Sequence, residues 1–243
     1  MDVTQLVRVI DTELRAQGTS DRAQHEKRYL RSDLDHYGTS VPAIRAVAKA
    51  VAARCPIPTH DEIIALVSAL WASNVHDCRM VTVELLDIYG EQLQPRDTAT
   101  IERLLRESRT WALVDGLSAS VMGHLVERFP ELGSVLDRWA VDDDFWIRRA
   151  ALLALLVALR RGEGDFERFG RYADAMLEER EFFIRKAIGW VLRDTARKRP
   201  DLVYRWLLPR APRASGVTIR EAVKPLSEGQ RAAVLAASRV RGR

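Results

Sequence analysis

Two stretches of the chain repeat one another, and this repeat restricts the possible folds more than any other feature. FWIRRAALLAL begins at Phe145 and FFIRKAIGWVL begins 37 residues later at Phe182, with Phe, Ile, Arg, Ala and Leu at matching offsets. A period of this length is typical of helix pairs that stack in HEAT-like arrays, because one pair alone cannot bury its apolar face. HDCRMVTVELL, from His76, is a degenerate candidate for a third copy. The repeat predicts an all-α fold, a curved solenoid of HEAT-like antiparallel helix pairs (an α-α superhelix).

Helix signals run along the whole chain, and we expect no strands because no alternating stretch lies between hairpin turns. Three segments have the form of capping boxes: Thr59–Glu62, Thr218–Glu221 and Ser227–Gln230. The apolar periodicity predicts helices over 3–16, 21–34, 41–53, 60–72, 76–91, 97–108, 111–128, 131–140, 143–160, 165–178, 181–198, 200–208, 216–224 and 228–239. We predict a single HEAT-like repeat domain over 1–243, with 209–216 a loop before a C-terminal helical cap.

The composition is that of an ordinary soluble protein, with 47% hydrophobic and 30% charged residues. The longest uncharged apolar run, 150–159, is too short to cross a bilayer, and the N-terminus lacks the apolar core of a signal peptide. Cys55 and Cys78 fit no metal or redox spacing. We therefore expect a cytoplasmic protein that does not contact membranes.

Positive charge is concentrated toward the C-terminus, although the net charge is only +4. Residues 180–243 carry 16 Lys and Arg against 5 Asp and Glu, whereas residues 1–179 carry 22 against 29. Such asymmetry is typical of a half that binds a polyanion. The alternative is a set of solvated helix faces in an arginine-rich composition, because binding requires the charges to gather on one surface.

The stretch SRTWALVDGLSASVMG, residues 108–123, places Trp111 and Asp115 four residues apart, on one face of a predicted helix. Ser118 and Met122 continue that line at i+7 and i+11. Small residues around the pair, such as Gly116, leave space for another molecule to approach this face of the helix. The alternative is that Asp115 caps or pairs locally within the protein.

The predicted helix 181–198 has an apolar stripe formed by Ile184, Ala187, Ile188, Val191 and Thr195, which we expect to face the core. Nearly opposite lie Lys186, Trp190, Arg193 and Arg197. Phosphates would satisfy these cations and the indole offers a flat face to a sugar or base, so this row is a candidate DNA-binding surface. The alternative is that Trp190 packs against a neighbouring helix and the cations are solvated.

The predicted helix 143–160 is apolar almost all round, yet carries Arg148, Arg149 and Arg160. A buried arginine needs a partner, because an unpaired buried cation is costly. That partner is either a carboxylate of the protein, such as Asp143 or Asp144, or a phosphate of the ligand. The pattern favours pairing within the protein, and we also retain Arg148 and Arg149 as candidate DNA-binding residues.

No arrangement of residues in the sequence by itself indicates an enzyme. No paired carboxylates accompany Asp115, and the five histidines (25, 36, 60, 76 and 124) form no metal or triad pattern. GEGDFERFG, residues 162–170, lacks the GxGxxG spacing and follows a helix, so it is not a phosphate loop. The residues alone indicate a helical repeat protein and leave DNA binding open.

The segment EFFIRKAIGWVLRDTARKRPDLV, residues 181–203, resembles the corresponding segment of the AlkD-type DNA alkylation repair glycosylases. Four more segments resemble that family in matching order: DDFWIRRAAL (143–152), TWALVDG (110–116), LWASNVHDCRMVTVELLD (70–87) and RYLRSDLDHYGTSVPAIR (28–45). The resemblance spans roughly residues 25 to 225, and five ordered motifs are far more specific than any one of them.

The resemblance implies an array of HEAT-like repeats that holds duplex DNA and excises cationic N3- or N7-alkylated purines without base flipping or a cofactor. It assigns the active-site aspartate to Asp115 and the flanking tryptophans to Trp111 and Trp190. It also assigns a DNA-backbone arginine to Arg149 and an aromatic residue near the lesion to Tyr29. We expect a monomeric enzyme whose partner is double-stranded DNA carrying alkylated purines.

The chain departs from the family pattern beside the expected site. The W-W-D-S-V-D form of the family reads Thr110-Trp111-Ala112-Leu113-Val114-Asp115 here, so one Trp and one Asp are absent. This departure concerns the range of lesions and the rate more than the type of reaction. Two alternatives are a noncatalytic HEAT-repeat protein that binds duplex or branched DNA, and a protein–protein scaffold.

Overall fold

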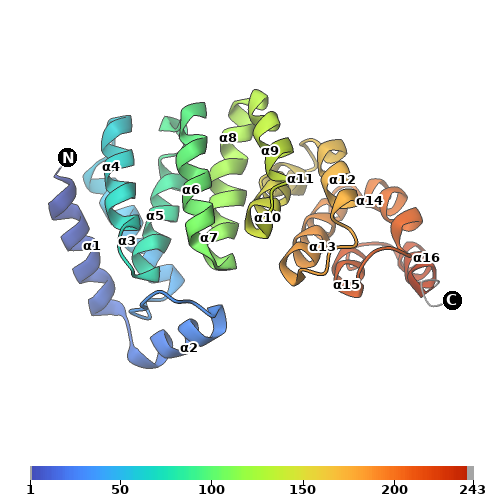
Figure 1. Cartoon of the computed structure of the whole chain (residues 1–243), viewed down its shortest axis with the longest axis horizontal. Coiled ribbons are helices and arrows are strands. Elements are labelled where there is room, and N and C mark those ends of the chain that lie inside the picture. The colour runs from blue at the N-terminus through green and yellow to red at the C-terminus, as the bar shows by residue number, and fades with distance from the viewer. Residues whose placement is uncertain (1, 240–243) are drawn as a thin grey trace. The chain divides into compact units, whose positions relative to one another are not determined.

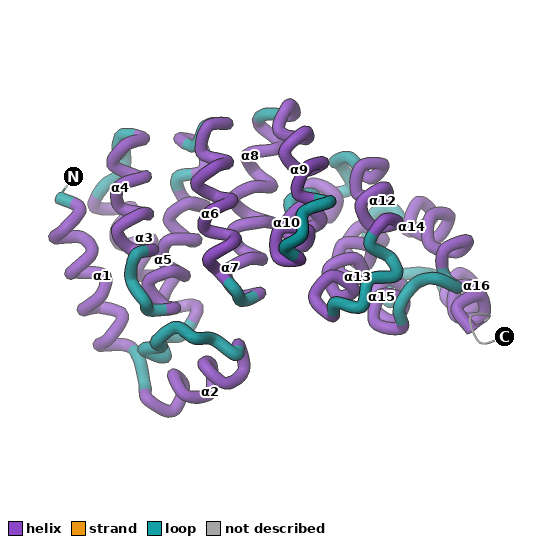
Figure 2. Tube along the Cα trace, in the orientation of Figure 1, coloured by secondary structure: helices purple, strands orange, loops and turns teal. Residues whose placement is uncertain are grey.

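The computed structural model describes residues 2–239, which are nearly all helical (Figure 1). Among these residues no strand forms (Figure 2). An isolated bridge joins Asp35 to Val75. The predicted all-α helical repeat class is confirmed. Within residues 2–239 no helix is both long and apolar enough to cross a membrane.

Contacts along the chain divide it into two compact units, Met1–Leu117 and Ser118–Arg243, which are described separately below. The single domain over 1–243 stays a prediction, and its ends, Met1 and residues 240–243, lie outside the described part of the chain. Residues 209–216 contain the end of a 3-10 turn, a run of turns and the first residue of a helix.

The first unit is built from helices joined by short loops. In it, α4 and α3 pack on α5, α5 packs on α7, and α1 contacts both α3 and α4. The elements are α1 (Val3–Gln17), α2 (Ser20–Leu30), α3 (Val41–Arg54), α4 (His60–Trp71), α5 (His76–Ile88), α6 (Thr98–Ser108) and α7 (Trp111–Gly116), with the 3-10 turns η1 (Gly90–Gln92) and η2 (Pro95–Asp97).

The second unit packs around α13, which contacts α10, α11, α14 and α15 (Figure 1). The predicted stripe of α13 is confirmed as core, because all five of its side chains are fully buried. The elements that follow α7 are η3 (Leu117–Met122), α8 (Gly123–Arg128), η4 (Pro130–Leu132), α9 (Gly133–Trp139), α10 (Phe145–Leu153), α11 (Leu156–Arg161), α12 (Phe166–Ala175), α13 (Phe182–Ala196), α14 (Pro200–Leu207), η5 (Leu208–Arg210), α15 (Gly216–Ala222) and α16 (Glu228–Ser238).

Helix boundaries agree with the sequence at two of the three predicted capping boxes. The side chains of Thr59 and Ser227 each accept a hydrogen bond from the N3 backbone N–H, and the N3 side chain accepts one from the N-cap backbone N–H. The box at Thr218 is wrong, because Thr218 lies inside α15. Ser215 caps that helix instead, and its hydroxyl oxygen accepts from the Thr218 N–H at 3.1 Å.

The predicted helices 111–128 and 143–160 are each interrupted. Residues Ala154 and Leu155 form a turn between α10 and α11. Between α7 and α8, η3 is a π-helix, whose i→i+5 hydrogen bonds wind the chain more widely than an α-helix. The expected line through Ser118 and Met122 is therefore wrong, since both side chains are fully buried.

Candidate functional site

The tryptophan and aspartate of the quoted stretch lie on α7, one helical turn apart and both partly exposed. Gly116 lets α7 approach α5 closely, because a Cβ at this position would lie 2.6 Å from Cγ1 of Val83. The close packing holds a six-residue helix against a neighbour of 13 residues. Trp111 and Asp115 therefore stand on a backbone that is fixed by contact with α5.

The structure brings Tyr29 against Trp111, although the two residues are far apart in sequence. Tyr29 lies near the end of α2 and is 67% exposed. Its ring centroid is 5.9 Å from that of Trp111, with the planes at 88°, which is an edge-to-face contact. His25 stacks on the Tyr29 ring with centroids 6.2 Å apart. Two aromatic residues assigned separately from the resemblance thus form one contact beside Asp115.

The predicted cationic row of α13 is extensively ion-paired rather than simply solvated. Glu221 of α15 accepts hydrogen bonds from Lys186, at 2.9 Å, and from Arg193. Lys224 adds a third cation, 3.0 Å from a Glu221 oxygen. The hydrogen bond from Lys186, with help from the other cations, lowers the pKa of Glu221 to about 2. Lys186 and Arg193 therefore help to join α13 to α15.

A buried carboxylate on α13 holds Trp190 in place. Asp194 is 5% exposed and accepts from the indole N–H of Trp190 at 3.1 Å. Arg193 also donates to Asp194 at 3.0 Å, and Arg160 of α11 lies 2.8 Å away. Arg197 is largely exposed, with its Nε 4.0 Å from Asp194. The Trp190 ring is thus partly exposed and anchored to the core through one hydrogen bond.

The arginines of α10 bond within the protein, as the sequence favoured, but not to the expected carboxylates. Arg148 makes a two-point ion pair with Glu179, at 3.0 and 2.9 Å, and also donates to backbone carbonyls. Arg149 is only 2% exposed and donates to the carbonyl oxygen of Phe183 on α13. Asp144 instead caps α10 by accepting from the Trp146 N–H. DNA-binding roles for Arg148 and Arg149 stay predictions.

Comparison with known proteins supplies the family. The sequence model of the DNA alkylation repair enzyme family matches residues 10–226. The chain belongs to this family. A search of curated proteins found no match.

Solved structures share the fold of this DNA alkylation repair family member at low sequence identity. A predicted DNA alkylation repair enzyme from Enterococcus faecalis superposes with a TM-score of 0.78 at 20% identity, over 87% of this chain and 98% of that one. The protein smu.31 from Streptococcus mutans UA159 gives 0.60 at 18% identity, over 85% and 98%. AlkD2 from Streptococcus mutans gives 0.58 at 16% identity, over 93% and 100%.

This family member contains a histidine cluster that the sequence analysis missed. The bridge between Asp35 and Val75 sets the next residues, His36 and His76, ring to ring with centroids 4.5 Å apart. Asp77 follows directly, and one ligand atom from each of the three lies within 4.8 Å of the others. The sequence gives no sign of this cluster, since a tertiary bridge joins residues 40 positions apart.

The geometry of this cluster is that of a buried support rather than a preformed metal site. The two rings are nearly parallel, at 13°, so their nitrogens do not converge on one point. Both oxygens of Asp77 already accept backbone N–H groups, from Tyr37 at 3.1 Å and Thr39 at 2.8 Å. Burial and the neighbouring His36 lower the pKa of His76 to about 4, so the ring is neutral near pH 7.

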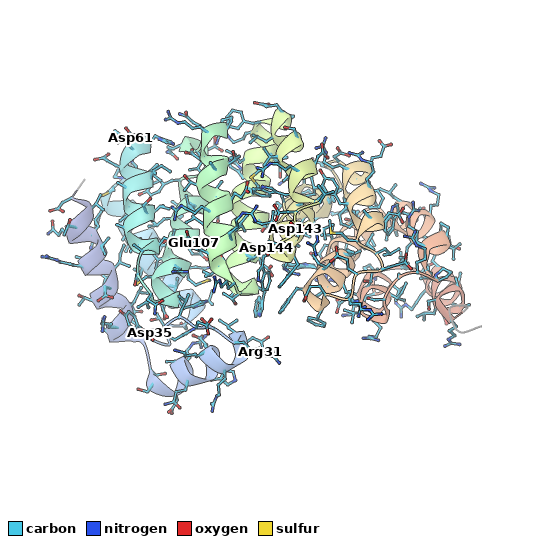
Figure 3. All side chains as sticks on the ribbon, in the orientation of Figure 1. Arg31, Asp35, Asp61, Glu107, Asp143 and Asp144 are labelled. Atoms are coloured by element: carbon cyan, nitrogen blue, oxygen red, sulfur yellow. The ribbon has the colours of Figure 1, made fainter. Side chains whose placement is uncertain are left out.

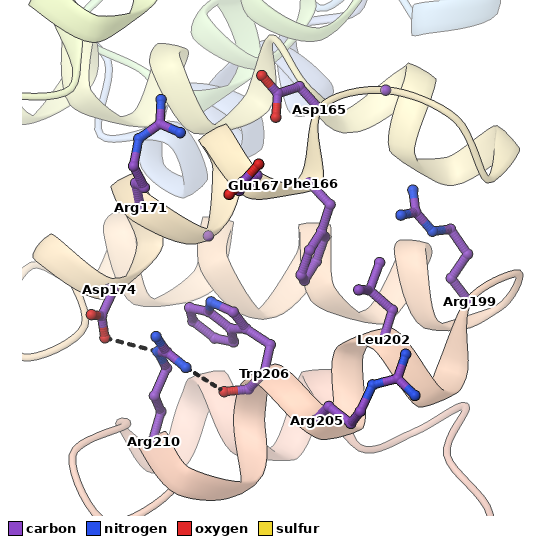
Figure 4. Close-up of a pocket in the computed structure, with 12 residues that line it drawn as sticks. Asp165, Phe166, Glu167, Arg171, Asp174, Arg199, Leu202, Arg205, Trp206 and Arg210 are labelled. Atoms are coloured by element: carbon purple, nitrogen blue, oxygen red, sulfur yellow. Dashed lines mark hydrogen bonds and ion pairs between the residues drawn. The ribbon is translucent and has the colours of Figure 1, made fainter.

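The second unit has a pocket of about 680 Å³ between α12 and α14, in which four arginines surround Phe166 and Trp206 (Figure 4). Three carboxylates line it as well, and Arg210 is bonded to one of them, Asp174, at 3.0 Å. The Arg210 guanidinium also covers the Trp206 ring, 4.7 Å from its centroid. One face of the Trp206 indole is therefore occupied by a contact within the protein.

Proposed function

We propose that this protein is a DNA glycosylase that hydrolyses the N-glycosidic bond of cationic N3- or N7-alkylated purines in duplex DNA. The observation that supports it most is the placement of Asp115 one turn from Trp111, with Tyr29 edge-on to that ring, in a member of the DNA alkylation repair enzyme family. The proposed reaction needs no metal and no cofactor, and water is the second substrate.

The chemistry of the lesion explains why one carboxylate suffices. Alkylation at N3 or N7 makes the purine cationic and a good leaving group, so no strong general acid is required. As the C1′–N bond stretches, positive charge develops on the deoxyribose. Two unit charges about 4 Å apart interact by about 4 kcal/mol at an effective dielectric constant of about 20. In this proposal Asp115 supplies that stabilisation and orients the attacking water.

The aromatic residues have a supporting role in the proposal. A developing sugar cation near the face of an indole gains about 0.5–2 kcal/mol from a cation–π interaction. Trp111 is held by its contact with Tyr29, and Trp190 by its hydrogen bond to Asp194. Fixed rings avoid the loss of side-chain freedom that would otherwise oppose DNA binding.

We propose that the lesion stays stacked in the duplex, as the resemblance implies, and that the grip on DNA is through its backbone. In the first unit Tyr29 is exposed and Trp111 is partly exposed, so both rings are accessible to a nucleotide that stays in the duplex. A base that need not enter a cavity can carry a bulky adduct. Affinity should fall steeply with salt, because phosphate contacts release counterions.

The test is incubation of the purified protein with methylated duplex DNA in the presence of EDTA, followed by detection of free bases. We expect release of 7-methylguanine or 3-methyladenine. DNA binding without base release would support a noncatalytic DNA-structure-binding protein and refute the glycosylase. No DNA affinity at moderate salt would favour a protein–protein scaffold.

A further inference from the structure

A pocket of about 320 Å³ in the first unit lies where three segments meet. The end of α2, the residues around the start of α5 and the junction of α6 with α7 all line it. The polar side chains that matter here are Arg31, Arg79, Glu107, Arg109 and Thr110. Figure 3 labels Arg31, at the end of α2, and Glu107.

Arg31 and Arg109 have no acidic partner, in contrast to the many arginines of this protein that form ion pairs. Neither guanidinium makes a hydrogen bond or ion pair with any residue in the range 2–239, and both residues are exposed. By contrast, Arg148 and Arg193 of the predicted DNA-binding set are engaged by carboxylates. Arg31 and Arg109 are therefore free to bind an external anion without breaking a contact inside the protein.

The third arginine of the pocket is partly buried and compensated by backbone carbonyls. Arg79 donates to the carbonyl oxygens of Ser73, at 3.3 Å, and Glu107, at 3.1 Å, and lies over the Trp71 ring. The Glu107 carboxylate accepts instead from the Trp71 indole at 2.7 Å. Thr110 is 2% exposed, and its hydroxyl oxygen has no partner in the described part of the chain. The pocket therefore offers more donors than the protein itself uses.

The backbone conformation at Arg31 and Arg109 is also unusual for arginine. Arg31 has φ 49° and Arg109 has φ 48°, and no other non-glycine residue among those described has a positive φ. Both are C-caps, where glycine is the usual residue because it adopts this left-handed conformation without strain. Arginine at both caps is locally less favourable than glycine would be, and no hydrogen bond or ion pair of either guanidinium within residues 2–239 offsets that cost.

The segments that carry the free arginines also carry the aromatic contact of the candidate site. Tyr29 stands two residues before Arg31, and Trp111 stands two residues after Arg109. The two segments that form the ring contact of 5.9 Å thus also line the pocket. A flat aromatic face next to a cationic pocket suits a nucleotide, whose sugar or base meets the ring while its phosphate meets the guanidiniums.

We infer that this pocket binds a backbone phosphodiester of DNA and so places the neighbouring nucleotide against Tyr29 and Trp111. Arg31 and Arg109 supply the charge and a planar fork of donors to the phosphate oxygens. Asp33 and Glu107 also line the pocket, and their negative charge opposes part of this attraction. The inference rests on the proposed function for the identity of the nucleic acid as DNA.

The test compares the wild type with the double variant Arg31→Gly/Arg109→Gly, using undamaged duplex DNA and fluorescence anisotropy between about 50 and 200 mM salt. Glycine removes the side chain and suits the left-handed backbone, so the melting temperature should stay level or rise. We expect the Kd to rise at least about 10-fold, with the slope of log K against log salt reduced by about 1.

Two further variants keep the test decisive. Arg22→Gln/Arg106→Gln removes the same charge from α2 and α6 at residues that are ion-paired at i,i+4 spacing, and should leave the slope near the wild-type value. Arg31→Lys/Arg109→Lys keeps the charge but loses the fork, and should have an intermediate Kd with the wild-type slope.

An unchanged Kd and slope in the glycine variant would overturn the inference, as would an equal loss in the Arg22→Gln/Arg106→Gln control. Base release from methylated DNA, measured on the same wild-type protein, separates this inference from the proposed function. If the wild type releases no base, the glycosylase proposal fails while the slopes still decide the pocket. If the wild type releases base and the glycine variant has the same salt slope as the wild type, only the pocket inference fails.

Discussion

The stacked pair of His36 and His76 makes the stability of this protein depend on pH in a way that can be calculated. His76 is 6% exposed, and burial together with repulsion from His36 lowers its pKa from 6.5 to about 4. Its Nε2 has no hydrogen-bond partner among residues 2–239, so no acceptor stabilises a proton on that nitrogen. We expect acidification to destabilise the fold before most carboxylates titrate.

The sign and the size follow from proton linkage. Above pH 6.5 the imidazole is neutral in both states, and His76 contributes no pH dependence. Below pH 6.5 the imidazole of His76 is protonated in the unfolded chain but stays neutral in the folded state until about pH 4. The free energy of unfolding therefore decreases as the pH is lowered through this window. The loss attributable to His76 reaches about 2 kcal/mol at pH 5.

The assay is urea unfolding of the wild type and of His76→Phe at pH 7 and pH 5. Phenylalanine keeps a flat ring against His36 but cannot be protonated. Between pH 7 and pH 5 the free energy of unfolding of the wild type should fall by about 2 kcal/mol more than that of the variant. Histidines such as His60, whose pKa is raised by Asp97, contribute equally to both proteins and cancel. An equal fall in the free energy of unfolding of the wild type and of His76→Phe would show that His76 does not cause the pH dependence.

Two other predictions concern the supports of the candidate site. Gly116→Ala should destabilise the fold by about 1–3 kcal/mol, because the added methyl group strains the packing of α7 on α5, and it should slow base release. Adding Val83→Ala should restore both the stability and the rate of base release. If the effects of the two substitutions on the free energy of unfolding were simply additive, residues 116 and 83 would not be in contact. Asp194→Asn should cost about 1–3 kcal/mol and increase the mobility of Trp190. Chemical denaturation and tryptophan fluorescence anisotropy measure the two effects, and an unaltered anisotropy would show that Asp194 does not hold the indole.

Periodicity in the sequence was sufficient to predict most of the helices and the buried stripe of α13. The stripe from Ile184 to Thr195 is core because its residues recur on one face of a helix, and this depends only on local spacing. The ordered motifs also led to the right family. These features are encoded within single helices or in the order of motifs along the chain.

Features that depend on contacts between distant segments could not be predicted in the same way. Glu221 neutralises Lys186 and Arg193 only because α15 packs on α13, and no spacing in the sequence indicates that pairing. His36 meets His76 through a single bridge that has no strand pattern around it. The left-handed backbone conformation of Arg31 and Arg109 could not be predicted, because sequence patterns expect glycine at such helix ends.

The central claim of this account is that Asp115 stabilises positive charge on the deoxyribose. The most direct measurement is the single-turnover rate of 7-methylguanine release from duplex DNA by the wild type and by Asp115→Asn, at saturating protein. We predict a loss of at least about 100-fold with duplex affinity unchanged. Release by Asp115→Asn at close to the wild-type rate would contradict the account.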